Sequence, residues 1–234
     1  MTTPLLSTHG LEAFYGDFQA LFGIDFEVHK GEIIAIIGAN GAGKSTFLKA
    51  VTGLLKTDSA AVRFKGQNCG GGKAHNIVAA GIAMVPEGRR LFPSLSVEEN
   101  LLMGQFTKRP GPWSLDAIYE LFPILRQKRN APSTSLSGGQ QQMVAIGRAL
   151  MSNPEILLCD EISLGLAPAV IKEIYEALAE ITANGLTAVI VEQDVGTAKR
   201  VSNRLYCLQE GRVSLVGPSS TLSIDQISKA YFGI

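Results

Sequence analysis

The chain has 234 residues, 46% of them hydrophobic, which is enough for one α/β domain with a large buried core. Its 21 Lys and Arg residues balance its 21 Asp and Glu residues, and this argues against a nucleic-acid partner because such proteins usually carry a basic excess. Its apolar runs are far shorter than the ~20 residues of a membrane-spanning helix, and its first residues lack the charged start and apolar stretch of a secretory signal.

The start of the chain predicts an antiparallel β lobe. Apolar residues alternate over residues 11–14 and 20–28, and Gly16-Asp17 between them is typical of a turn. Tyr15 lies beside this turn, and Phe14 and Phe18 are its aromatic neighbours.

A strand, a glycine-rich loop and a helix are predicted next. Residues 32–37 are apolar and β-branched, as in a buried strand, and residues 44–54 have apolar side chains at helical spacing. Between them, Gly38-Ala39-Asn40-Gly41-Ala42-Gly43-Lys44-Ser45, followed by Thr46, fits the pattern G-x-x-x-x-G-K-[ST]. Because phosphates bind at a helix N-terminus, this order of elements predicts a nucleoside-triphosphate pocket rather than a glycine-rich turn without a ligand.

Each part of this loop has its own chemical reason. Glycines let backbone N–H groups turn toward phosphates, Lys44 can reach the outer phosphates, and the Ser45 hydroxyl is suited to ligate Mg²⁺. A phosphate loop alone does not distinguish kinases, GTPases, helicases and transport ATPases. The remainder of the chain has to make that distinction.

Strand patterns continue at residues 61–64 and 81–85 and then stop. Residues 88–151 instead predict helices over residues 97–106, 115–125 with an interruption at Pro123, and 139–150, which indicates a helical insert. Cys69, Cys159 and Cys207 are far apart, and we expect them to be small buried hydrophobic residues in a reducing compartment rather than disulfides or metal ligands.

Strands and helices alternate again beyond the insert. The patterns predict strands over residues 156–159, 187–191, 204–208 and 212–216, and a helix over residues 168–183. The fold class is therefore α/β, a P-loop NTPase with a mostly parallel central sheet, an N-terminal antiparallel β lobe and an inserted helical subdomain. We expect a single domain over residues 1–234, divided into 1–87, 88–151 and 152–234.

Two adjacent carboxylates follow the predicted strand at residues 156–159. In a parallel sheet such a strand end lies at the same edge as the phosphate loop. Asp160 is therefore predicted to hold Mg²⁺ directly or through water, and Glu161 to polarise the attacking water as a general base. The alternative is an ordinary solvated strand end.

The phosphate loop, Leu136-Ser137-Gly138-Gly139-Gln140 and Asp160-Glu161, in this order, resemble the ATP-binding subunit of an ABC transporter over almost the whole chain. The resemblance implies that residues 136–140 bind the nucleotide of a facing protomer, so that two chains enclose two ATP molecules. Physically, Ser137, Gly138 and Gly139 open a helix whose N-terminus favours a γ-phosphate. Local sequence alone fits equally well with Ser137 as a simple helix cap.

The resemblance also implies roles for three further residues, two of which depart from the family pattern. Tyr15 stands where the family places an aromatic that stacks on adenine, although Phe14 and Phe18 are competitors. Glu87 stands where a glutamine is usual, and either ligates Mg²⁺ through water or forms only local hydrogen bonds. Gln193 replaces a usual histidine, so it can donate a hydrogen bond to the γ-phosphate but cannot shuttle a proton.

Together with these departures, the sequences at residues 86–90, 94–101, 163–168 and 191–193 are similar to one of the two ATPase subunits of branched-chain amino-acid importers. The implied partners are a second ABC ATPase subunit, in a heterodimer or a homodimer of the isolated chain, transmembrane permease subunits and, indirectly, a solute-binding protein. The implied cofactors are ATP and Mg²⁺, and the implied location is cytoplasmic, on the inner face of the membrane. Alternatives are a urea or short-amide importer and a nucleotide-responsive docking module that hydrolyses little.

One segment is expected to face the permease. Residues 89–92, Arg89-Arg90-Leu91-Phe92, follow Glu87 at the start of the insert, where movement of the nucleotide site would reach a membrane partner. For the two arginines, a solvated basic turn is an equal alternative.

Overall fold

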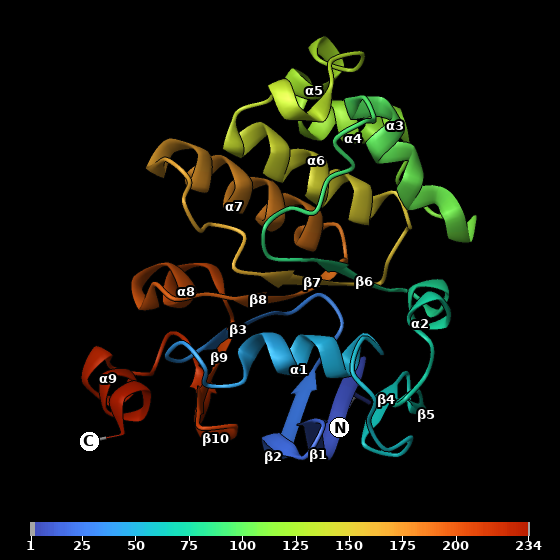
Figure 1. Cartoon of the computed structure of the whole chain (residues 1–234). Helices are drawn as coiled ribbons and strands as arrows, with labels where there is room; N and C mark the ends of the chain where they lie inside the picture. Colours follow the sequence, from blue (N-terminus) through green and yellow to red (C-terminus); the bar gives the residue numbers. More distant parts are fainter. Residues whose placement is uncertain (1–2, 234) are drawn as a thin grey trace.

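A computed structural model describes residues 3–233, and among these residues the larger of two β-sheets has six strands (Figure 1). Their spatial order is β10 (Arg212–Pro218), β9 (Arg204–Gln209), β3 (Ile33–Ile37), β8 (Thr187–Val191), β7 (Ile156–Asp160) and β6 (Ile82–Val85). All neighbours pair in parallel except β10 and β9, which are antiparallel. The predicted mostly parallel sheet is confirmed.

The smaller sheet is the predicted antiparallel lobe. Its strand order is β2 (Phe18–Val28), β1 (Leu6–Tyr15), β4 (Val62–Phe64) and β5 (Gln67–Asn68). Strands β1 and β2 form a hairpin in which Tyr15 pairs with Phe18 across the Gly16-Asp17 turn. The tip of this hairpin therefore presents the aromatic residues that the sequence places there.

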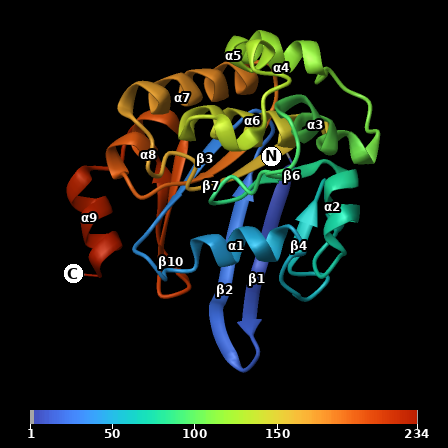
Figure 2. The ribbon, with the colours of Figure 1, turned by 45° about the horizontal axis from the view of Figure 1, so that its top comes forward.

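Helices cover both faces of the larger sheet. Figures 1 and 2 show α1 (Lys44–Val51) on one side of it, together with the smaller sheet, and α6 (Gly138–Leu150) and α7 (Pro168–Ala183) on the other. Strand β3 contributes to the core on both faces of the sheet. Ile34 and Ile36 belong to the core that includes α1, whereas Ala35 and Ile37 belong to the core that includes α6 and α7. A strand buried on both faces explains why residues 32–37 read as a continuous apolar run.

The helical stretch before α6 is more broken than the sequence predicts. It contains α3 (Val97–Leu102), a 3₁₀ turn at Met103–Thr107, α4 (Leu115–Leu121), α5 (Pro123–Gln127) and a second 3₁₀ turn at Ser133–Ser135. Pro123 lacks the N–H needed inside a helix, so the predicted helix over residues 115–125 ends at Leu121 and a new one begins at the proline.

Three short helices and one short strand are not predicted from the sequence. They are α2 (Ala74–Ala80), α8 (Val195–Val201), α9 (Ile224–Phe232) and β5. Each of the three helices buries one residue, namely Ile77, Ala198 and Ile227, respectively. Helices α2 and α8 are too short to show helical periodicity, whereas α9 has apolar residues at helical spacing, Ile224, Ile227 and Tyr231, that were not recognised from the sequence.

Within the described part of the chain, no helix has both the length and the hydropathy to cross a bilayer. Cys159 and Cys207 are buried in strands as predicted, Cys69 is half-buried, and all three are free thiols. Burial raises the pKa of each of these thiols, so the cysteines behave as small apolar side chains.

Candidate functional site

Residues 38–45 connect β3 to α1 at the carboxyl edge of the parallel strands. Gly38 has a φ of 151°, and a Cβ there would lie 2.2 Å from the carbonyl oxygen of Leu208. Gly43 has a φ of 103°, and its Cβ would lie 2.8 Å from the Leu21 side chain. Both positions therefore need glycine because of backbone conformation and because of space, and the loop backbone stays free to face a ligand.

The Lys44 side chain folds back onto this loop. Its ammonium donates hydrogen bonds to the carbonyl oxygens of Gly38 at 2.8 Å and Ala39 at 3.1 Å. It also lies 3.6 Å from a carboxylate oxygen of Glu161, although the side chain is only 4% exposed. A nearly buried cation is thus held at the centre of the loop, where an outer phosphate would be attracted.

The two predicted carboxylates end β7 beside this loop. The Ser45 hydroxyl donates to a carboxylate oxygen of Asp160 at 2.9 Å. Burial raises the pKa of the Asp160 carboxyl, the Ser45 hydrogen bond opposes this rise, and the charges of Glu161 and Glu87 add to it. A carboxylate whose charge is disfavoured by burial and by neighbouring acids is suited to a cation, and a hydroxyl and a carboxylate side by side are oxygen ligands that fit Mg²⁺.

Glu161 is held from three sides. Its backbone is left-handed, with a φ of 48°, and its N–H donates to the carbonyl oxygen of Val191. One carboxylate oxygen faces Lys44, and the other accepts a 2.7 Å hydrogen bond from the Gln193 amide. A non-glycine residue rarely adopts this backbone region, and such conformations cluster at functional sites.

These groups line one cleft of about 490 Å³. The cleft is lined by residues of the loop and of the first turn of α1, by two glutamates, by the Gln193 amide and by one residue of the segment after Glu161: Asn40, Gly41, Gly43, Lys44, Ser45, Thr46, Glu87, Glu161, Leu164 and Gln193. Among residues 3–233, no group of three or more His, Cys, Asp or Glu side chains is arranged to hold a metal ion.

Tyr15 reaches the start of α1 from the hairpin tip. Its hydroxyl lies 3.4 Å from the Thr46 hydroxyl, which itself lines the cleft, and the residue is 45% exposed. Phe14 and Phe18 are also exposed, at 43% and 71%. Of the three aromatics, Tyr15 is therefore the one that the structure ties to the phosphate loop.

Residues 137–140 lie elsewhere, at the N-terminus of α6. Ser137 caps this helix, and it forms a reciprocal capping box with Gln140. The N-terminus is partly exposed at Ser137 and Gly138, whereas Gly139 is buried against Val170 of α7. These residues do not line the cleft of their own chain. Ser137 can therefore cap the helix and also belong to a phosphate-binding helix end, because capping only orders the end at which the N–H groups of the first turn point along the helix axis.

Close packing against Val170 requires glycine at position 139, and this requirement can be tested. A Cβ at this position would lie 2.4 Å from a methyl carbon of Val170, so we expect Gly139→Ala to lower the free energy of unfolding by about 1–3 kcal/mol. Val170→Ala in the same chain removes that methyl group and should restore most of the loss, measured by urea denaturation. Equal destabilisation with and without Val170→Ala would show that the clash is not the cause.

The segment after Glu87 has an unusual backbone. Gly88, Arg89 and Arg90 have φ values of 73°, 63° and 48°, so three consecutive residues are left-handed. Helix α6 holds this turn, since Arg148 donates to the Arg89 carbonyl at 3.0 Å and the Arg89 guanidinium donates to Gln141 at 3.2 Å.

The four residues 89–92 therefore point to different places. Arg90 and Phe92 line a cavity of about 360 Å³ beside the 3₁₀ turn that contains Met103 and Phe106. The remaining two face inward, Arg89 toward α6 and Leu91 against the buried core. Only half of the segment expected to meet a permease thus faces this cavity.

Comparison with known proteins gives consistent results. A family model described as "ABC transporter" matches residues 21–163. The chain is 42% identical over 232 residues to the high-affinity branched-chain amino acid transport ATP-binding protein BraG of Pseudomonas aeruginosa, covering 98% of this chain and 100% of BraG. It is 34% identical over 221 residues to the "Probable branched-chain amino acid transport ATP-binding protein LivF" of Archaeoglobus fulgidus, covering 93% and 94% of the two chains.

Solved structures with the same fold are also similar. An ATP-binding cassette of an ABC transporter superimposes with a TM-score of 0.84 and 29% identity, covering 98% of this chain and 99% of the other. A dimeric ATP-binding cassette in a post-hydrolysis state, bound to ADP and Pi, gives a TM-score of 0.81 and 26% identity, covering 92% and 98%. Both matches extend over nearly the full length of the described fold.

Proposed function

The chain belongs to the ABC transporter ATPase family, and we propose that it binds and hydrolyses ATP to power the uptake of branched-chain or other hydrophobic amino acids. The observation that carries this proposal is that Lys44, Ser45 and Glu161 line one cleft, with the Asp160 carboxylate hydrogen-bonded to Ser45 beside it. The transported solute is inferred from the 42% identity to a branched-chain amino acid transport protein along nearly the whole chain.

The residues around the phosphate loop divide the work of binding. Residues 38–46 hold the phosphates through backbone N–H groups, and Lys44 supplies the cation that faces the outer phosphates. Ser45 and Asp160 would hold Mg²⁺. Glu87 lines the same cleft, and its negative charge raises the pKa of Asp160, so Glu87 would ligate the ion through water. Bound Mg²⁺ neutralises phosphate charge as it develops during cleavage.

Glu161 is the proposed general base. Its carboxylate is oriented by Lys44 on one side and Gln193 on the other, so it can accept a proton from a water positioned in the cleft. Gln193 contributes a neutral amide in place of an imidazole, and its hydrogen bond to Glu161 places that amide where it can also meet a γ-phosphate.

Residues 137–140 are proposed to complete the site of a second ATPase subunit. They lie outside their own cleft, at a helix N-terminus that is exposed at Ser137 and partly exposed at Gly138, and a dimeric cassette of the same fold is known. We infer a heterodimer in the transporter and allow a homodimer of the isolated chain. The two-subunit state should form when ATP is present and hydrolysis is blocked, measured as a doubling of mass by size-exclusion chromatography coupled to light scattering.

The cavity lined by Arg90 and Phe92 is proposed to receive a permease subunit. Phe92, Met103 and Phe106 are 44%, 49% and 83% exposed, so three large apolar side chains gather around this cavity. The permease would in turn meet a solute-binding protein. This assembly places the chain in the cytoplasm, at the inner face of the membrane.

Tyr15 is proposed to stack on the adenine ring. We expect Tyr15→Ala to weaken ATP binding about three- to tenfold, which corresponds to the loss of one aromatic stacking contact. Tyr15→Phe keeps the ring and should bind ATP within twofold of the wild type, measured with a fluorescent ATP analogue. Phe18→Ala is the matched control, and a larger loss there than in Tyr15→Ala would assign the stacking role to Phe18.

The function itself is tested with the complex purified with its membrane subunits and placed in vesicles. Loaded binding protein should stimulate phosphate release when the solute is leucine, isoleucine or valine. Stimulation by urea or short amides alone would overturn the solute assignment. Phosphate release no faster than in the Glu161→Gln complex would instead favour a docking module that hydrolyses little.

A further inference from the structure

Glu192, directly after β8, is a buried carboxylate with no place in the chemistry above. It is 2% exposed, and among residues 3–233 no Lys, Arg or His forms an ion pair with it. Burial raises the pKa of the Glu192 carboxyl, and hydrogen bonds from hydroxyl groups oppose this rise. A buried acid without a cation costs folding free energy, so its presence needs a reason beyond packing.

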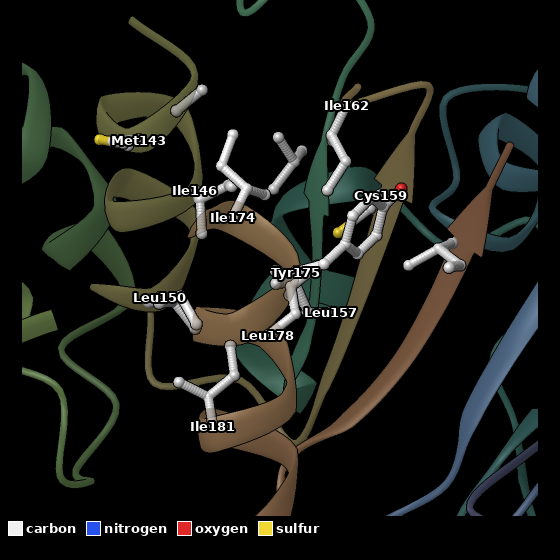
Figure 3. Packing of buried hydrophobic residues seen from close by; sticks show 14 of the residues in the cluster. Met143, Ile146, Leu150, Leu157, Cys159, Ile162, Ile174, Tyr175, Leu178 and Ile181 are labelled. Carbon is white, nitrogen blue, oxygen red and sulfur yellow. The ribbon is translucent and has the colours of Figure 1, made fainter. Parts of the chain in front are cut away.

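Both carboxylate oxygens of Glu192 accept hydrogen bonds from side chains of other segments. The Ser163 hydroxyl donates to one oxygen at 2.8 Å, and the Tyr175 hydroxyl of α7 donates to the other. Figure 3 shows the Tyr175 ring extending from α7 toward Cys159 on β7, beside Ile162. Glu192 therefore joins the end of β8 to α7 and to the segment that follows Glu161.

Ser163 is the point at which this segment is tethered. Residues 162–167 run from Glu161 to α7, with Ile162 buried and Leu164 exposed at the edge of the cleft. Gly165 has a left-handed φ of 71°, so the segment turns there. The Ser163 hydroxyl, which donates to Glu192, links this segment to the residue that follows β8.

On its other side, Glu192 is joined by one peptide bond to Gln193, which donates to Glu161. Glu161 and Ser163 are thus held by two adjacent residues after β8: Glu161 by the Gln193 side chain, and Ser163 by the Glu192 side chain. Residues 38–46, which carry phosphate binding, make no hydrogen bond to the Glu192 side chain.

We propose that Glu192 is a positioning residue that fixes residues 162–167 against Gln193, so that Glu161 keeps one orientation during hydrolysis. The inference rests on the proposed function, since it concerns the hydrolytic step at Glu161. Because the Glu192 and Ser163 side chains make no hydrogen bond to residues 38–46, loss of the tether should slow hydrolysis without weakening ATP binding.

The test uses the complex purified with its membrane subunits and measures kcat per bound nucleotide together with the Kd for a fluorescent ATP analogue. Ser163→Ala should lower kcat about tenfold and leave Kd within twofold. Ser163→Thr keeps a hydroxyl and should recover at least half of the wild-type kcat. Ser202→Ala is the matched control, since Ser202 is also a half-buried serine with side-chain hydrogen bonds, and it should leave both constants unchanged.

A double-mutant cycle tests whether Ser163 and Glu192 act through the same contact. Glu192→Gln should also lower kcat, and Ser163→Ala combined with Glu192→Gln should be no slower than the slower single variant. Multiplicative losses, or an unchanged kcat per bound nucleotide in Ser163→Ala, would overturn the positioning role. If Glu192→Gln does not fold, the Ser163→Ala and Ser163→Thr pair decides alone. A wild-type complex that hydrolyses no ATP would contradict the proposed function instead.

Discussion

Glu161→Gln is expected to reduce ATP hydrolysis by the assembled complex at least about 100-fold, because a positioned general base contributes 10²–10⁴-fold to such reactions. The amide oxygen can still accept the hydrogen bond from Gln193, so the surrounding geometry is retained. Binding of ATP should not weaken, since the substitution removes a negative charge beside the phosphates. Phosphate release and equilibrium binding of a fluorescent ATP analogue measure the two effects separately.

This variant should also trap the two-subunit state. With ATP bound and not cleaved, a stable dimer should be visible by size-exclusion chromatography coupled to light scattering. Glu176→Gln is the control, because Glu176 is an exposed acid on α7 that pairs only with Lys172. If Glu161→Gln hydrolysed ATP at the wild-type rate, another group would have to act as the base.

Lys44→Ala is expected to weaken ATP binding at least about 100-fold, because the ammonium is expected to make two charge-assisted hydrogen bonds to phosphate, each worth about 1.5–3 kcal/mol. The nearly buried ammonium is also the countercharge nearest to Glu161, at 3.6 Å, so its loss leaves an acid facing the phosphates. Isothermal titration calorimetry with ATP measures the change directly.

Lys49→Ala tests whether the effect belongs to Lys44 or to positive charge on α1 in general. Lys49 is exposed in the last turn of the same helix and does not line the cleft, so its removal should alter ATP affinity less than threefold. Thermal unfolding of both variants separates lost binding from lost folding. Equal losses of affinity in the two variants would contradict the assigned role of Lys44.

Long elements with clear ends could be predicted from the sequence. Helix α7 and strand β8 match the predicted residue ranges, since a 16-residue amphipathic helix begins at Pro168 and Gly185 separates it from a strand buried on both faces. The short helices α2 and α8 could not, because each buries a single residue and is stabilised by the sheet on which it packs. The division of the chain at residues 87/88 and 151/152 stays a prediction.

The cleft could be predicted for the same kind of reason. Strand ends of a parallel sheet meet at one edge, so Lys44, Asp160 and Glu161 are brought together by topology that the sequence pattern already implies. The Glu161–Gln193 and Ser163–Glu192 contacts could not be predicted, because they depend on side-chain directions after two separate strands. The inward direction of Arg89 was likewise hidden, since it follows from three consecutive left-handed residues.

The three left-handed residues Gly88 to Arg90 raise the conformational free energy of the backbone at this turn. A left-handed arginine is about 1–2 kcal/mol less favourable than a right-handed one, whereas glycine tolerates either form. Glycine at position 90 would therefore remove most of this cost without breaking the hydrogen bonds that join Arg89 to α6. As long as those hydrogen bonds hold, the turn after Glu87 and the helix that begins after Ser137 should move as one rigid unit.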